Sequence, residues 1–167
     1  MLRKSMGVLL AAGLFLSAVS CLAASSELIE TDTISTFSIV AYDPEYKEWG
    51  VAVQSKFLAV GSVVPFAAAD CGAIASQAWG NITYGAEGLG LLKDGNDAQS
   101  VLNVLTSKDE AKEYRQVGII DANGSAASFT GENCQFWAGH KTGKHYCVQG
   151  NILTGKNVVD AMAKAFE

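Results

Sequence analysis

The chain has 167 residues, a length typical of one globular domain with a short extension. It carries 12 basic and 17 acidic side chains, a formal net charge of −5, and no run of basic residues. This balance argues against binding to nucleic acid or to anionic lipid surfaces, because both depend on clustered positive charge.

The first 23 residues have the pattern of a secretory signal peptide. Arg3 and Lys4 supply a positive start, an apolar run follows over 8–19, and small residues close the segment. The run is too short, and too closely followed by polar residues, to span a membrane. We expect a periplasmic or secreted protein cut near Ala23 or Ala24. Loss of the two basic residues then takes the formal charge from −5 to −7.

Cys21 offers a second processing route. Small residues precede it at the end of the apolar run, as they do at sites of lipid attachment. Ala18, however, stands where a leucine is usual, so we favour simple cleavage over a lipoprotein. Both routes lead out of the cytoplasm.

Residues 24–35 predict a flexible leader, and 36–56 predict a pair of strands. The leader is polar and has no periodicity. In the next stretch apolar residues alternate, break at Asp43-Pro44, and resume over 51–53, which is the pattern of a β-hairpin. Thr36 begins this hairpin. Its hydroxyl would become a nucleophile if a cut freed its backbone amine.

The apolar stretch over 57–75 predicts buried strand segments, because short apolar runs alternate with glycine, proline and aspartate. It leads into SQAWGNITYG, residues 76–85, which contains Gln77, Trp79 and Asn81. Polar side chains that follow a buried strand commonly build binding sites. A turn packed beneath Trp79 is the structural alternative.

The second half predicts helices and strands in alternation. We expect a helix over 87–93, a helix capped by Asp97, strands over 115–121 and 126–130 joined by a turn at Asn123-Gly124, a looser segment over 131–147, and a strand over 146–152. A final helix, capped by Asn157, turns four apolar residues inward: Val158, Val159, Met162 and Phe166.

Three cysteines follow Cys21. A disulfide between Cys134 and Cys147 would close a loop of about a dozen residues and add about 3 kcal/mol of stability. Cys71 lies in an apolar run and is expected to be a small buried residue. His140 and His145 lie between the paired cysteines, but the spacing matches no standard zinc site. We expect no metal and no cofactor, since nucleotide and haem motifs are also absent from the sequence.

Several motifs, in order and in register, resemble the uncharacterised DUF1028 family: TFSIVA at 36–41, GVAVQSKFLAVGSVVPF at 50–66, SQAWGN at 76–81, RQVGIID at 115–121, WAGH at 137–140 and VQGN at 148–151. The similarity extends over 36–167. It implies an α+β fold of the Ntn-hydrolase type, a four-layer αββα sandwich of two antiparallel sheets between helices. The order of predicted elements also suits a layered α+β domain. Family members usually extend further, so we expect the domain to be incomplete at its C-terminus.

The resemblance also implies an amidohydrolase with an N-terminal threonine, acting on peptide-like or N-acyl amides. Thr36 would be the nucleophile, with Lys56 and Ser55 close to it. The substrate would lie near Gln77, Trp79 and Asn81, and the resemblance places oxyanion donors in the same segment. A second candidate binding pair is Trp137 and His140, which offer an aromatic ring and a polar group.

Two non-enzymatic interpretations stay open. One is a cell-envelope or extracellular binding protein associated with wall material or a surface appendage, and the other is a structural paralogue without a ligand. Thr36 lies about a dozen residues beyond the signal cleavage, so catalysis needs a second cut at Ser35–Thr36. A threonine that begins a strand also needs no chemistry. The expected partner is a small-molecule or peptide-like ligand, with a homo-oligomer left open.

Overall fold

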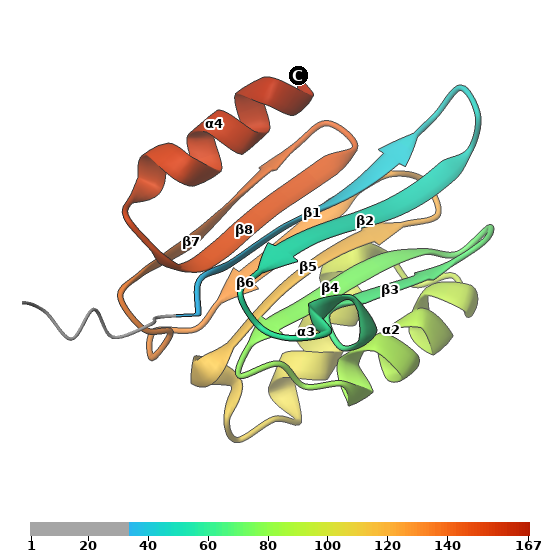
Figure 1. Cartoon of the computed structure of the whole chain (residues 1–167). Helices are drawn as coiled ribbons and strands as arrows, with labels where there is room; N and C mark the ends of the chain where they lie inside the picture. Colours follow the sequence, from blue (N-terminus) through green and yellow to red (C-terminus); the bar gives the residue numbers. More distant parts are fainter. Residues whose placement is uncertain (1–33) are drawn as a thin grey trace, which may run out of the picture. The chain divides into compact units, whose positions relative to one another are not determined.

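The structure, a computed structural model, describes residues 34–167. The predicted signal peptide, Cys21 and residues 24–33 of the predicted leader lie outside the described residues. The described part contains two antiparallel sheets and three α-helices (Figure 1). In chain order the elements are β1 (Thr36–Asp43), β2 (Glu48–Ser55), η2 (Val60–Ser62), β3 (Pro65–Ala68), β4 (Gly72–Ala78), α2 (Thr83–Lys93), α3 (Ala98–Ser107), η3 (Lys112–Tyr114), β5 (Arg115–Asp121), β6 (Ala126–Thr130), β7 (Trp137–Gly143), β8 (Tyr146–Leu153) and α4 (Lys156–Phe166).

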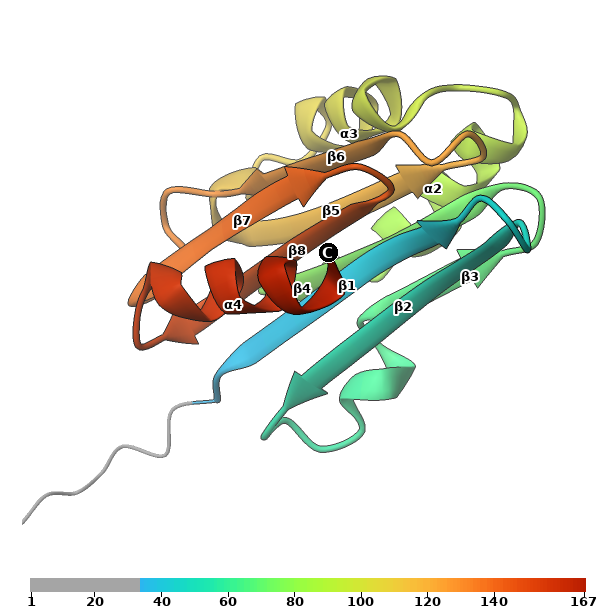
Figure 2. The same ribbon diagram turned by 90° about the horizontal axis from the view of Figure 1, so that it is seen from above.

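The two sheets have four strands each and lie face to face. One has the order β2-β1-β8-β7 and the other β3-β4-β5-β6 (Figures 1 and 2). The register of the first sheet sets Thr36 opposite Ser55 on β2 and opposite Asn151 on β8. The beginning of β1 therefore lies beside the end of each neighbouring strand.

Two aspartates close the hairpins that the sequence predicted. Asp43 accepts hydrogen bonds from the backbone of Glu45 and Tyr46 through Oδ1, which fixes the turn between β1 and β2. Asp121 accepts likewise from the backbone of Asn123 and Ser125 in the turn between β5 and β6. Such local bonds from aspartate are a common reason for a chain to turn at that residue. Both predicted strand pairs are confirmed.

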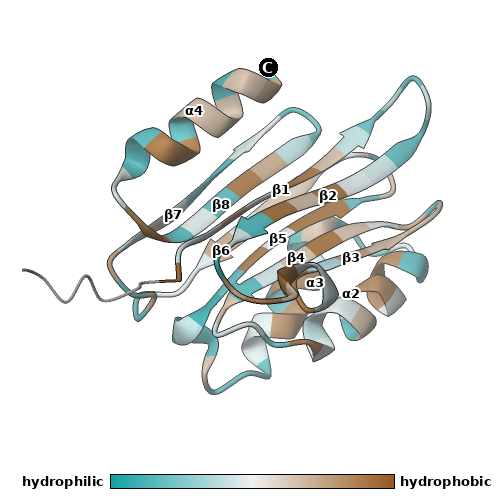
Figure 3. Ribbon diagram, viewed as in Figure 1, coloured by the Kyte–Doolittle hydropathy of each residue, from teal (hydrophilic) through white to brown (hydrophobic). Residues whose placement is uncertain are grey.

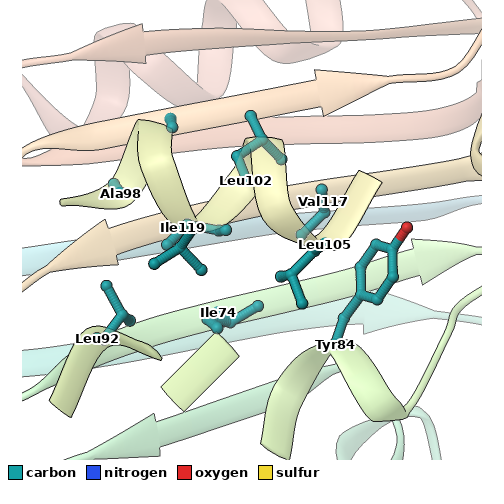
Figure 4. Close-up of a cluster of buried hydrophobic side chains, with 10 residues drawn as sticks. Ile74, Tyr84, Leu92, Ala98, Leu102, Leu105, Val117 and Ile119 are labelled. Carbon is teal, nitrogen blue, oxygen red and sulfur yellow. The ribbon is translucent and has the colours of Figure 1, made fainter. Parts of the chain in front are cut away.

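The helices cover the outer faces of the sheets. Helices α2 and α3 pack on the second sheet, where Leu102 and Leu105 meet Ile74 and Ile119 (Figure 4). Helix α4 packs on the first sheet through side chains that include Val159. Each fully buried side chain of this size contributes about 1.5–3 kcal/mol relative to exposure. Figure 3 shows the matching pattern, with hydrophobic residues along the strands and hydrophilic ones in the β1–β2 turn.

Segment 137–143, expected to be part of a loop, forms strand β7 instead. It pairs with β8 at the edge of the sheet, where His140 lies opposite Gln149. Three of its residues are exposed, since an edge strand presents much of its surface to solvent, and this exposure hid the strand pattern. The prediction of a loop there was wrong.

The predicted disulfide is also absent, and the described cysteines Cys71, Cys134 and Cys147 are all free. Cys147 pairs with Thr142 at one end of β7, whereas Cys134 precedes the other end, where Trp137 lies opposite Leu153. The six residues from position 147 to 153 span about 20 Å of strand, far beyond the reach of a disulfide. Cys147 is fully buried instead, and Cys71 is only partly buried against the helices.

The helix boundaries agree in part. Asp97 caps α3 as predicted, by accepting from the Ser100 amide at 2.9 Å. Helix α2 begins four residues earlier than expected, and α4 follows Gly155 without a side-chain cap from Asn157. The Phe166 side chain is 46% exposed, although its ring lies 5.0 Å from that of Tyr146. Within residues 34–167 no helix is both long and apolar enough to cross a membrane.

Candidate functional site

A cavity of about 410 Å³ lies where β1 begins and where β4 and β8 end. This volume is typical of small-molecule sites. The wall is formed by residues from the start of β1, the segment between β2 and β3, the end of β4 and the turn after it, the end of η3, the turn before β7, and the end of β8: Ile34, Thr36, Phe57, Val60, Val63, Val64, Ser76, Gln77, Ala78, Trp79, Gly80, Ile82, Tyr114, Asn133, Cys134, Gln135, Asn151 and Ile152.

Thr36 lies in this wall with its hydroxyl held in place. Its Oγ1 is 2.9 Å from Ser55 Oγ, and the residue is only 8% exposed. The preceding Ser35 donates through Oγ to the carbonyl of Ile152 at 2.6 Å. The structure thus brings the predicted pair Thr36 and Ser55 together. Lys56 is exposed and does not line the cavity.

Next to Thr36, four side-chain amides and one hydroxyl group join the two sheets. This group is here named the amide cluster and consists of Ser38, Gln77, Gln116, Gln149 and Asn151. Gln116 Oε1 accepts from both Gln77 Nε2 at 2.8 Å and Asn151 Nδ2 at 3.0 Å. Ser38 Oγ donates to Gln77 Oε1 and accepts from Gln149 Nε2, each at 2.7 Å. All five residues are at most 3% exposed. Gln77 and Asn151 also line the cavity, so the cluster fixes two of its polar groups.

The cluster extends away from the cavity to His140. Gln116 Nε2 donates to Thr130 Oγ1 at 2.9 Å, and Thr130 Oγ1 lies 2.8 Å from His140 Nδ1. Partial burial lowers the pKa of the His140 imidazole. Trp137 packs against apolar residues between the first sheet and α4, which include Leu153 and Val159. The second predicted binding pair therefore lies outside the cavity.

A charged cluster supports the turn after β4 from behind. Asp109 Oδ2 accepts from Arg115 Nε at 2.9 Å, from Tyr84 Oη at 3.0 Å and from Asn81 Nδ2 at 3.3 Å. The hydrogen bond from Arg115 lowers the pKa of Asp109 to about 2, and burial raises the pKa of Tyr84. Arg115 also donates to the carbonyl of Trp79. Asn81 therefore holds the turn, while Gln77 and Trp79 face the cavity.

Two residues of the cavity wall have a strained backbone. Ala78 has φ of 66° at the end of β4, and Ile152 has φ of 57° near the end of β8. This conformation is unusual for any residue with a Cβ and especially for a β-branched one. Ile152 lies where the β7–β8 register shifts between Trp137 and Gly139. Strain of this kind, held by surrounding structure, is typical of functional sites.

Sequence reasoning found Thr36, Ser55, Gln77 and Trp79 but missed the rest of the amide cluster. The available signal was a glutamine inside each of two apolar strands, in RQVGIID and VQGN. A polar residue that alternates with buried apolar ones must meet a partner. Within residues 34–167 no group of three or more His, Cys, Asp or Glu side chains is placed to hold a metal ion.

Comparison with known families gives one clear result. A family model described as a family of unknown function, DUF1028, matches residues 36–167. The chain belongs to the DUF1028 family. The membership that the motifs predicted is therefore confirmed over the range predicted for the domain.

A solved structure of another DUF1028 protein, SPO2555 from Silicibacter pomeroyi, is similar to this chain. The TM-score is 0.76 at 37% sequence identity, and the match covers 80% of this chain. The chain spans 59% of the length of that DUF1028 protein. A search of curated proteins found no match.

Proposed function

We propose that this DUF1028 protein is an exported amidohydrolase of the Ntn type, with Thr36 as nucleophile after a cut at Ser35–Thr36. The observation that carries this proposal is the position of the Thr36 hydroxyl, which lies in a cavity wall 2.9 Å from Ser55 Oγ. Two stacked antiparallel sheets with helices on their outer faces also suit the Ntn-hydrolase fold that the resemblance implies. Peptide-like and N-acyl amides are the proposed substrates.

The chemistry follows from a free amine on Thr36. The amine takes the hydroxyl proton, and Oγ1 attacks the carbonyl carbon of the substrate amide. The proton passes to the leaving amine as the C–N bond breaks, and water then hydrolyses the ester on Oγ1.

The turn after β4 supplies the best oxyanion donor. The Trp79 amide donates to the Tyr114 carbonyl, and the Asn81 amide donates to Ser76 Oγ. The amide of Gly80 is the one between these two in sequence, and Gly80 lines the cavity. We assign it to the developing negative charge, because a backbone N–H held by its neighbours needs no reorganisation during the reaction.

A non-catalytic envelope binding protein is the second candidate, and one observation favours it. None of the described residues that line the cavity is charged, and Lys56 is exposed outside it. The Ntn resemblance implies a cation close to the amine of the nucleophile. A lining without charge suits a protein that binds a neutral ligand and leaves it intact.

The start of the mature chain decides between these candidates. Mass spectrometry of the exported protein should show a chain that begins at Thr36, and the Thr36→Ala variant should retain Ser35. Thr142→Ala, at an exposed threonine of β7, is the matched control and should be cut like the parent chain. Chains that begin at Ala24 or Ser25, and stay so on incubation, would contradict the proposal and favour the binding protein.

A second measurement tests turnover itself. If the mature chain begins at Thr36, it should hydrolyse N-acyl amides, and the Thr36→Ala variant should show no hydrolysis above background. Hydrolysis that survives in Thr36→Ala would place the nucleophile elsewhere.

A further inference from the structure

The described residues that line the cavity beside Thr36 carry no charge, in a chain whose formal net charge is −5. This lining consists of apolar, hydroxyl, thiol and amide side chains and one glycine. Arg115 and Asp109 lie behind the Trp79 turn, where they bind each other. A charged group that enters this cavity would therefore lose water without gaining a partner of opposite charge from the lining side chains, and such a transfer is unfavourable.

Several large exposed hydrophobic side chains gather around the cavity. Nine large hydrophobic side chains are exposed within residues 34–167, and five of them line this cavity: Ile34, Phe57, Trp79, Ile82 and Tyr114. A cut at Ser35–Thr36 removes Ile34 and leaves the other four in place. The rings of Trp79 and Tyr114 lie 5.5 Å apart at an angle of 35°, which forms a continuous aromatic surface. Exposed apolar side chains that gather at one place mark a binding site, whereas scattered ones do not.

Polar groups in the wall suit a neutral amide. Asn133 and Gln135 are exposed in the turn before β7 and line the cavity. Gln77 and Asn151, which are bonded to Gln116, offer only the hydrogen-bonding capacity that the amide cluster leaves unused. A primary amide both donates and accepts hydrogen bonds, as an amide ligand does. A carboxylate only accepts, and an ammonium only donates, so either uses half of this capacity.

We propose that the cavity selects electrically neutral amides that carry an aromatic or aliphatic group, and rejects the corresponding carboxylates and ammonium ions. The scissile amide would face Thr36, and the apolar group would pack on the Trp79–Tyr114 surface. This inference rests on the proposed function in taking the cavity as the substrate site. It adds the substrate class, which the nucleophile alone does not fix.

The test is a binding comparison on the full-length Thr36→Ala chain, which cannot turn over a ligand through Thr36. Four probes share one scaffold: N-acetyl-phenylalaninamide is neutral, N-acetyl-phenylalanine carries a carboxylate, phenylalaninamide carries an ammonium group, and N-acetyl-alaninamide lacks the ring. Shifts of assigned backbone amide resonances give the affinity and the location of each probe. The neutral aromatic probe should bind with a dissociation constant in the millimolar range or below and shift resonances of cavity residues. The other three should bind about tenfold more weakly or worse.

Two matched substitutions locate the effect. Ile82→Lys adds a charge at the rim and should weaken binding of N-acetyl-phenylalaninamide by about tenfold or more. Tyr46→Lys adds the same charge at an equally exposed residue in the β1–β2 turn and should leave binding unchanged. Equal or tighter binding of the charged probes, no saturable binding of the neutral one, or shifts confined to other surfaces would overturn the proposal.

The binding test and the tests of cleavage and hydrolysis can fail independently of each other. Charge-selective binding by a chain that is never cut at Ser35 would support the cavity assignment and refute hydrolysis. Cleavage at Ser35 and amide hydrolysis, combined with equal binding of charged probes, would refute the substrate class alone.

Discussion

The space between the two sheets has two ends of opposite character, although the same four strands build both. At one end lies the amide cluster, with residues from β1, β4, β5 and β8. At the other end the same strands contribute apolar residues that include Val40, Ala73, Ala75, Ile120 and Cys147. The change occurs within a few residues on every strand. Position along the strand, and not the choice of strand, therefore determines polarity.

The difference shows what each end contributes. Well-packed apolar residues would stabilise the domain at least as well as buried amides. Within the described residues no buried side-chain nitrogen or oxygen lacks a hydrogen-bond partner, so the amide cluster is complete. A complete network holds each member in one orientation. We conclude that the apolar end stabilises the domain and the amide end orients the cavity wall.

Gly118 lies close to the boundary between the two ends. A Cβ at this position would collide with Gln149 Oε1 and Cys147 Sγ, which come from the opposite sheet. The absence of a side chain lets the Gln149 amide occupy the space between the sheets. A single glycine thus permits the change from apolar to polar packing.

The largest effect on stability is expected at the apolar end. Ile120 is fully buried, so Ile120→Ala should lower the free energy of unfolding by about 3–4 kcal/mol. Binding of N-acetyl-phenylalaninamide to the folded fraction should not change. Equilibrium urea unfolding and the amide-shift titration measure the two quantities. A parallel loss of binding would show that the two ends do not act separately.

At the amide end, a substitution should cost less stability than Ile120→Ala but should weaken ligand binding. Gln116→Leu leaves Gln77 Nε2 and Asn151 Nδ2 without their shared acceptor and should cost about 2 kcal/mol of stability. Binding of the neutral probe should fall about tenfold or more, because two wall amides lose their orientation. Gln54→Leu, at an exposed glutamine of β2, is the control and should change neither quantity appreciably. Normal binding by Gln116→Leu would refute the orienting role.

Asp109, behind the cavity wall, should make a pH-dependent contribution to the free energy of unfolding. Its folded-state pKa is about 2, below the ordinary 3.8, so its stabilising effect is complete above pH 3.8 and is lost as the pH falls through 2. Asp109→Asn should cost about 1.5 kcal/mol at neutral pH. Urea unfolding of both proteins from pH 5 to 2 measures this, and the difference should shrink toward pH 2. A difference independent of pH would exclude ionisation as its source.

The smallest expected effect concerns the strained wall. Ala78 has φ of 66°, so Ala78→Gly should raise stability by about 0.5–1 kcal/mol by relieving that strain. Ala126→Gly, in the regular strand β6, should instead lower stability by a similar amount. Thermal unfolding of the two variants provides the comparison. Destabilisation of equal size in both would show that Ala78 is not strained.

Much of the fold follows from local signals. At both turns, Asp43-Pro44 and Asn123-Gly124, an aspartate side chain accepts a hydrogen bond from a backbone amide two residues later. Asp97 caps its helix by accepting from the backbone amide of Ser100, three residues later. Strand β7 forms a tight hairpin with β8, in which Gly143 lies opposite Tyr146. Its exposed residues 140–142 do not alternate with buried ones, so the signal that revealed the other hairpins is missing here. Once β7 is a strand, Cys134 and Cys147 lie near opposite ends of it, and for this reason the loop and the disulfide were both predicted wrongly.

The candidate site also combines contacts that are local in the sequence with contacts that are distant. Thr36 and Ser55 are neighbours in a hairpin, so their contact could be predicted from the alternation of that hairpin alone. Gln116 meets Gln77 across 39 residues and Asn151 across 35. Each glutamine is visible in the sequence as a polar residue in an apolar strand, but its partner is not. The cavity exists only where these distant segments converge.

The long-range bonds around Thr36 also set the time at which the site can form. Gln149 reaches Ser38 across 111 residues, and Ser35 reaches Ile152 across 117, so neither bond can form before β8 docks beside β1. Closing such long loops is slow compared with forming a local hairpin. The hairpin that contains Thr36 can therefore be complete well before its surroundings are. The proposed cut and hydrolysis at Thr36 would therefore begin only at the last steps of folding.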